Sequence, residues 1–110
     1  MSYCALTDVK PILRITSTDT SHDTEVTNAI TDACTLIDVH LSLYITVPLQ
    51  PTYPEGIPMI AKYFAAAIYL NLYPVSDISY RQAERYWQLA DKLLDEYIRR
   101  TYYIGKVFST

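Results

Sequence analysis

The segment from Ile57 to Leu72 constrains the fold most, because its residues are apolar on nearly every side of a helix. Lys62 is its only charged residue. Pro58 stands near the first helical position, where a missing backbone N–H has least effect, and Pro74 follows at the end, where it cannot continue a helix. A helix with so little polar surface must be covered by other elements, so we expect it at the centre of a helical bundle.

A clear amphipathic pattern precedes this segment and predicts a helix that covers it. From about His22 to Leu41, apolar residues recur at steps of four, three, four and four. Asp23 and Glu25 lie in the first turn, where the helix dipole favours anions. The β-branched and aromatic residues that come after Leu41 are poorly tolerated in helices, so we expect the helix to end there.

The last helix is predicted from its capping pattern and its length. Ser79 with Gln82 makes a capping box, which places the start of the helix at Ser79, and the periodic pattern runs to about Thr101. A helix of more than 20 residues is longer than its neighbours, so one end should overhang the bundle. The residues predicted to share the core with this helix are Val26, Ile30, Ile37, Ile60, Phe64, Ile68, Trp87, Ala90 and Leu94.

The N-terminal residues predict a short first helix. Thr7 and Asp8 are possible N-caps, and Pro11 falls within or just past the first turn. Six small polar residues, 16–21, then favour a loop. Half of the residues are hydrophobic and 19% are charged, which is typical of a folded domain rather than a disordered one. Residues 1–110 are therefore expected to form one all-α domain, a small bundle of about four helices.

Two segments outside the helices are predicted to be interfaces. Prolines 48, 51 and 54 favour an extended loop, and that loop is too short to bury its own apolar residues, which are Val47, Leu49 and Tyr53. From about residue 102 the chain enters a tail with aromatic and β-branched residues but no strand to pair with. We expect the tail to dock on another protein, and folding back over the third helix is the alternative. The predicted tail interface consists of Tyr102, Tyr103, Ile104, Val107 and Phe108.

Composition and spacing argue against several classes of function. The two glycines, Gly56 and Gly105, are too few for a glycine-rich phosphate loop. His22 and His40 lie about 27 Å apart on one helix and cannot share a metal. We predict no catalytic, cofactor-binding or metal-binding residues, hence no enzyme. The longest apolar run has eight residues, against the ~20 that a membrane span needs.

Charge is distributed unevenly along the chain. The net charge is -3, which disfavours a protein that works mainly by neutralising phosphates. Residues 1–56 carry seven acids and two bases, whereas residues 57–110 carry five acids and seven bases. The two halves therefore have formal charges of -5 and +2. Head-to-tail association of identical subunits could use such an asymmetry.

Two sets of residues resemble a known family. The first is Leu6-Thr7-x-Val9 with Leu13-Arg14-Ile15, followed by a polar loop and an acidic-capped helix that ends in Ile37-Asp38. The second is Ile57-Pro58, Lys62, the alanine cluster from Ala65 to Ala67, and Tyr69-x-Asn71-x-Tyr73. Both resemble the small head-tail connector proteins, also called adaptor or head-completion proteins, of long-tailed bacteriophages and prophages.

The resemblance implies a structural virion protein. Such proteins form a ring of identical subunits, usually twelve, that docks under the capsid portal and carries the tail or stopper, with double-stranded DNA as passing cargo. It also implies a place at the head-tail junction of the virion, and in the host cytoplasm during assembly, with no membrane partner. The loop residues Val47, Leu49 and Tyr53 would then contact the portal or a neighbouring subunit. The alternative is a small helical regulatory or DNA-binding module of a mobile element.

Overall fold

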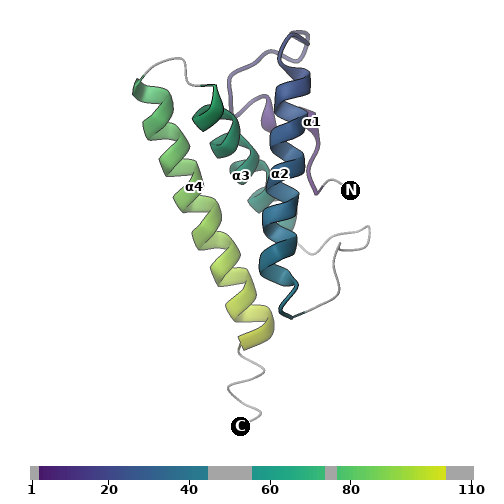
Figure 1. Cartoon of the computed structure of the whole chain (residues 1–110), viewed down its shortest axis with the longest axis vertical. Helices are drawn as coiled ribbons and strands as arrows, with labels where there is room; N and C mark the ends of the chain where they lie inside the picture. Colours follow the sequence, from purple (N-terminus) through teal and green to yellow (C-terminus); the bar gives the residue numbers. More distant parts are fainter. Residues whose placement is uncertain (1–2, 45–55, 74–76, 104–110) are drawn as a thin grey trace.

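The protein is a small bundle of helices (Figure 1). The structure is a computed structural model that describes residues 3–44, 56–73 and 77–103. Four α-helices, α1 (Leu6–Val9), α2 (Asp23–Leu41), α3 (Ile57–Leu72) and α4 (Asp77–Ile98), are followed by a π-helical turn, η1 (Arg99–Tyr103). The predicted all-α bundle of about four helices is therefore confirmed. The loop residues Val47, Leu49 and Tyr53 lie outside the described part of the chain.

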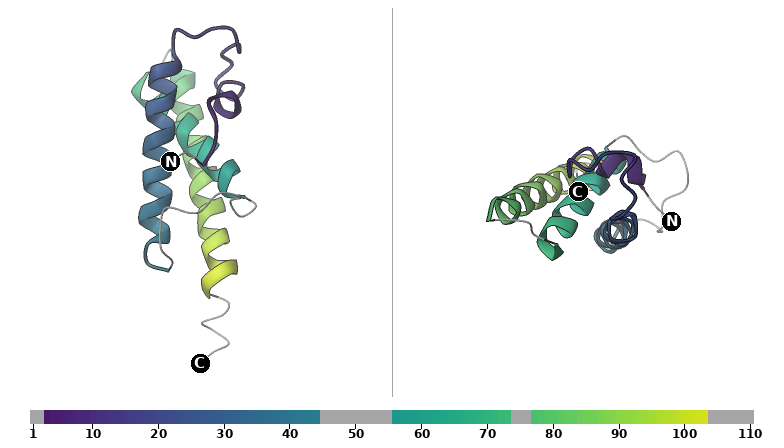
Figure 2. Two further views of the ribbon diagram at one scale, coloured as in Figure 1. Left: turned by 90° about the vertical axis from the view of Figure 1, so that its right-hand side faces the viewer. Right: turned by 90° about the horizontal axis from the view of Figure 1, so that it is seen from above.

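Helix α3 is the centre of the bundle, as its apolar composition predicts. It packs against α2 and α4, which lie on opposite sides of it when the molecule is seen from above (Figure 2), and it also contacts α1. Gly56 precedes it with φ of 98°, a left-handed conformation that favours glycine, and Pro58 lies in the first turn. The buried residues of α3 are Ile57, Ile60, Ala61, Phe64, Ala65, Ala66, Ala67, Tyr69 and Leu70.

Helix α2 follows the predicted pattern closely. It begins at Asp23 and ends at Leu41, and Asp23 and Glu25 occupy its first turn. Every apolar position of the predicted stripe is buried: Val26, Ile30, Ala33, Ile37 and Leu41. Cys34 is buried beside this stripe as a small core residue.

Helix α1 begins earlier than its sequence suggested. Ala5 is the N-cap residue, and its backbone N–H donates to the carboxylate of Asp8 at 2.8 Å. Thr7 and Asp8 are therefore inside the helix, and their assignment as N-caps is wrong. Pro11 lies after the end of this single turn. The carboxylate of Asp8, at the third helical position, caps the helix from within. Sequence inspection misses this arrangement because alanine has no capping side chain and is not expected at an N-cap.

Lys10 joins the first helix to the start of the second. It is only 4% exposed, and its ammonium Nζ donates to the carbonyl of Asp19 at 2.7 Å and to the carboxylate Oδ1 of Asp23 at 2.8 Å. A longer contact of 3.5 Å reaches the carbonyl of Ser17. The polar loop after α1 therefore wraps around a buried cation.

Helix α4 differs from its prediction at both ends. It begins at Asp77, two residues before Ser79, so the capping box predicted at Ser79 is wrong and Ser79 is a buried residue within the helix. The chain remains helical past the predicted end at Thr101, through the π-helical turn to Tyr103. Tyr102 and Tyr103, expected in the tail, belong to this turn. Ile104, Val107 and Phe108 lie outside the described residues.

The predicted core is correct except along one edge. Buried as expected are Val26, Ile30, Ile37, Ile60, Phe64, Ala90 and Leu94. Ile68 is only partly buried, and Trp87 is 42% exposed, so its placement in the core is wrong. Helical periodicity assigns Trp87 to the apolar side of α4, but it does not say how far α2 extends over that side.

Candidate interaction groove

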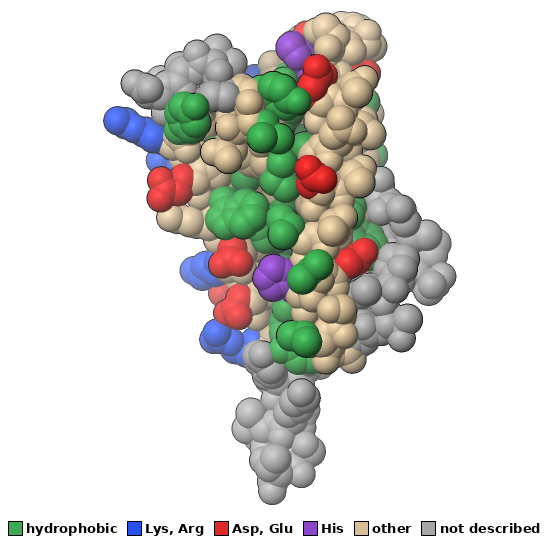
Figure 3. Space-filling view, viewed as in Figure 1, with side chains coloured by type: hydrophobic (Ala, Val, Ile, Leu, Met, Phe, Trp, Pro, Cys, Tyr) green, Lys and Arg blue, Asp and Glu red, His purple; other side chains and the backbone are tan. Residues whose placement is uncertain are grey.

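Helices α2 and α4 both lie on α3 and leave a groove between them. The groove has a volume of about 680 Å³, and α3 forms its floor with Ala67, Ile68 and Asn71. Apolar side chains run down this face between the two outer helices (Figure 3). The other lining residues are Asp32 and Leu36 from α2, Leu72 from α3, and Tyr80, Ala83, Glu84 and Trp87 from α4.

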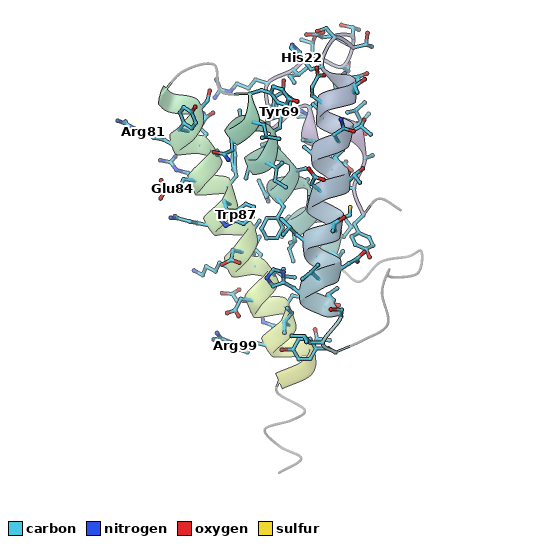
Figure 4. The ribbon with its side chains drawn as sticks, viewed as in Figure 1. His22, Tyr69, Arg81, Glu84, Trp87 and Arg99 are labelled. Atoms are coloured by element: carbon cyan, nitrogen blue, oxygen red, sulfur yellow. The ribbon has the colours of Figure 1, made fainter. Side chains whose placement is uncertain are left out.

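Trp87 is the largest side chain of the groove. Its ring meets Phe64 of α3 edge to face, with centroids 5.1 Å apart and an interplanar angle of 70°. Trp87 lies where α4 faces α2 across the groove (Figure 4). The contact with Phe64 holds one part of the indole while 42% of the residue remains accessible. A rigid, half-exposed tryptophan of this kind is a common energetic centre of protein interfaces.

Other large apolar residues of the groove are also accessible. Leu72 is 61% exposed and Tyr80 is 52% exposed, and both line the same hollow as Trp87. Single exposed apolar residues are ordinary on protein surfaces, but a set that lines one concave site marks a surface suited to a partner.

Carboxylates stand on both walls of the groove. Asp32 belongs to α2 and Glu84 to α4, and both are exposed. Farther along the same pair of helices a second hollow contains Asp91, Lys92 and Asp95, and there Asp95 accepts a hydrogen bond from Arg99 at 2.7 Å. Both members of that pair are mostly exposed, so it contributes little to stability. The groove therefore presents a mostly apolar floor with one carboxylate on each wall.

The histidines and cysteines lie apart from the groove floor. His40 is exposed in the second hollow, and its Nδ1 donates to the carbonyl of Leu36 at 2.8 Å. Burial raises the pKa of the Cys4 thiol to about 12 and also raises that of Cys34. In residues 3–44, 56–73 and 77–103, no cluster of three or more His, Cys, Asp or Glu side chains could hold a metal ion. None of the helices in the described ranges is long and apolar enough to span a membrane.

The groove was not predicted from the sequence. The predicted interface residues Val47, Leu49, Tyr53, Ile104, Val107 and Phe108 lie outside the described residues, so these predictions stay predictions. A signal for the groove was present in α4, where Tyr80, Glu84 and Trp87 follow at steps of four and three along one face. Comparisons with protein-family models, curated proteins and solved structures found no match to this chain. Its fold and this groove are therefore the features that bear on function.

Proposed function

We propose that this protein is a structural adaptor of a long-tailed phage or prophage, which assembles into a ring between the capsid portal and the tail or stopper. The observation that carries the proposal is the apolar groove with its half-exposed Trp87 on a small helical domain. A surface of this kind is suited to docking another protein. The ring, usually of twelve subunits in proteins of this family, would surround the path of the DNA.

The positions of the residues behind the resemblance support this proposal. Val9, in the first motif, is fully buried in α1, and Ile57-Pro58 opens α3. The alanine cluster from Ala65 to Ala67 is buried where α3 meets its neighbours. These residues set the packing of the bundle, which accords with a resemblance in architecture rather than in chemistry.

Electron microscopy of the purified chain and of the particle tests the proposal. We expect closed rings, or rings that form when the portal is added, and a position at the head-tail junction of the virion. Preparations made without this protein should contain heads that lack attached tails. Complete particles formed in its absence would contradict the proposal.

A deletion tests the predicted role of the proline-rich loop in assembly. Removing residues 48–53 should leave the helical circular dichroism spectrum unchanged and should abolish ring formation, because the deletion removes Leu49 and Tyr53, two of the three residues expected to contact a neighbour. Normal rings from the deletion variant would show that Leu49 and Tyr53 are not needed.

The same purified sample tests the DNA-binding alternative. The cations Arg81, Arg85 and Lys92 are exposed on α4, but Glu84 and Asp91 are exposed among them. We therefore expect weak binding to duplex DNA with no sequence preference. Tight binding that falls steeply as salt rises would favour the alternative over the adaptor.

A further inference from the structure

We propose that the groove between α2 and α4 is the receptor for a second copy of this chain, and that its occupant is the segment around Val107 and Phe108 of that copy. The inference rests on the proposed function and deepens it, because it names the contact that joins one subunit to the next. The occupant combines two adjacent apolar side chains with the cation Lys106.

The groove has room for large apolar side chains. Ala67 on its floor and Ala83 on its α4 wall are small, and the larger Trp87 and Leu72 line the same hollow. Its volume of about 680 Å³ lies within the range of ~300–1,000 Å³ that is usual for sites that enclose a ligand. An aromatic side chain such as Phe108 can therefore enter against the exposed part of Trp87.

The charges of the two surfaces are complementary. Asp32 and Glu84 place a carboxylate on each wall of the groove. The last 14 residues, 97–110, contain three cations, which include Lys106, and no acid. The apolar pair Val107 and Phe108, next to the cation Lys106, thus meets a mostly apolar groove that carries two carboxylates. Complementary charges of this kind fix the orientation of a complex and speed its formation.

The same segment is too short to lie along the groove of its own subunit. The α4 residues that line the groove, Tyr80 to Trp87, lie 16 to 23 residues before Tyr103, or about 24–35 Å along a helix. Phe108 is five residues past Tyr103, so its backbone reaches at most about 18 Å from there. A segment from another molecule has no such limit, because its attachment does not restrict how far along the groove it lies.

Two other self-associations fit the groove less well. Pairing of the groove with the same groove of a second copy would bring together two surfaces whose only charged lining residues, among those the structure describes, are Asp32 and Glu84, and like charges in an interface are unfavourable. Residues 45–55 include the apolar Val47, Leu49 and Tyr53, but they contain no lysine or arginine to meet the carboxylates. A segment-in-groove contact is heterologous, and such contacts build rings when the rotation between subunits closes.

Trp87 is the only tryptophan in the chain, so its fluorescence reports on the groove. Two tryptophan-free peptides, residues 99–110 and residues 45–55, are titrated into the full-length protein at a concentration where sedimentation shows monomers. We expect the 99–110 peptide to shift the emission to shorter wavelength with saturation, and its affinity to fall as salt rises. A shift produced by the 45–55 peptide instead, or by neither peptide, would overturn the proposal.

A matched pair of variants locates the binding. Leu72→Lys places a cation at an exposed position of the groove, where it also suits the C-terminal end of α3. Leu43→Lys makes the same change at a residue that is 80% exposed and does not line the groove. We expect Leu72→Lys to weaken binding of the 99–110 peptide about tenfold or more, or ~1.4 kcal/mol, and Leu43→Lys to leave it unchanged. Equal effects of the two variants would overturn the proposal.

Mixing two full-length variants tests the contact in assembly. Leu72→Lys has a damaged groove and an intact C-terminal segment. Phe108→Asp has an intact groove and a damaged segment. We expect neither variant to associate alone, while a one-to-one mixture forms a heterodimer and nothing larger. Normal rings from both variants would overturn this inference without contradicting the adaptor function. A heterodimer from the mixture, with no ring from the unaltered chain even when the portal is added, would support this inference and contradict that function.

Discussion

The buried Lys10 offers the sharpest test of how the first helix is attached to the bundle. Replacing Lys10 with methionine keeps most of the aliphatic stem and removes the ammonium. The variant therefore keeps a buried apolar side chain at this position and loses the hydrogen bonds to the carbonyl of Asp19 and the carboxylate of Asp23. Circular dichroism in increasing urea measures the resulting change in the free energy of unfolding.

The expected size follows from the burial of the two charges. Removing one partner of a fully buried ion pair costs about 3–5 kcal/mol, because the other charge is left without compensation. The side chain of Asp23 is 30% exposed and stands in the first turn of α2, so water and the helix dipole compensate part of that loss. We therefore expect Lys10→Met to lower the free energy of unfolding by about 2–3 kcal/mol.

A double-mutant cycle separates the ion pair from the rest of the change. Asp23→Asn alone should also destabilise the protein, and the double variant should lose less than the sum of the two single losses. A loss below about 0.5 kcal/mol for Lys10→Met, the size of an ordinary surface substitution, would refute this account. Additive single losses would show that Lys10 acts through the carbonyl of Asp19 and not through Asp23.

Three further predictions concern the core, the thiols and the first loop. Leu94→Ala should lower the free energy of unfolding by about 2–5 kcal/mol because Leu94 is 1% exposed, and the same change at Leu89, which is 38% exposed, should lower it clearly less. Equal losses in urea unfolding would contradict the assignment of Leu94 to the core. With its pKa raised to about 12, the Cys4 thiol should resist alkylation near pH 8 until urea unfolds the chain, and rapid native labelling would be inconsistent with its burial. Hydrogen bonds from the Ser21 hydroxyl and amide lower the pKa of Asp19. The stability that they add should therefore be present above the unfolded pKa of about 3.9 and be lost as pH falls through the lower pKa of the folded state. If Ser21→Ala leaves the NMR titration of Asp19 unchanged, these hydrogen bonds are not the cause.

The sequence by itself determined the helices and their order along the chain. The apolar surface of Ile57–Leu72 required a central helix, and the spacing of apolar residues defined α2 to within one residue of its start. These features are local, because they depend on side chains three or four residues apart and on the prolines and glycine at the helix ends. The ends of α1 and α4 were less predictable, since Ala5 is an N-cap without a capping side chain and Ser79 is buried in the helix it was expected to cap.

Only the tertiary structure decided which residues meet across long stretches of sequence. Lys10 reaches Asp23 around the polar loop, and the hydroxyl of Tyr3 donates to the carboxylate of Asp38, 35 residues away. No periodic pattern relates these residues. The packing of whole helices brings them together, so the sequence offered no reason to pair them.

The groove depends on tertiary structure for the same reason. Periodicity places Trp87 on the apolar side of α4, and the same pattern holds whether α2 covers that side or stops short of it. In the structure α2 and α4 both pack against α3 and leave Trp87 at the edge of the space between them. A side chain's place on its own helix follows from local spacing. Its exposure depends on the distance and angle between helices, and these are set by contacts between residues far apart in the sequence.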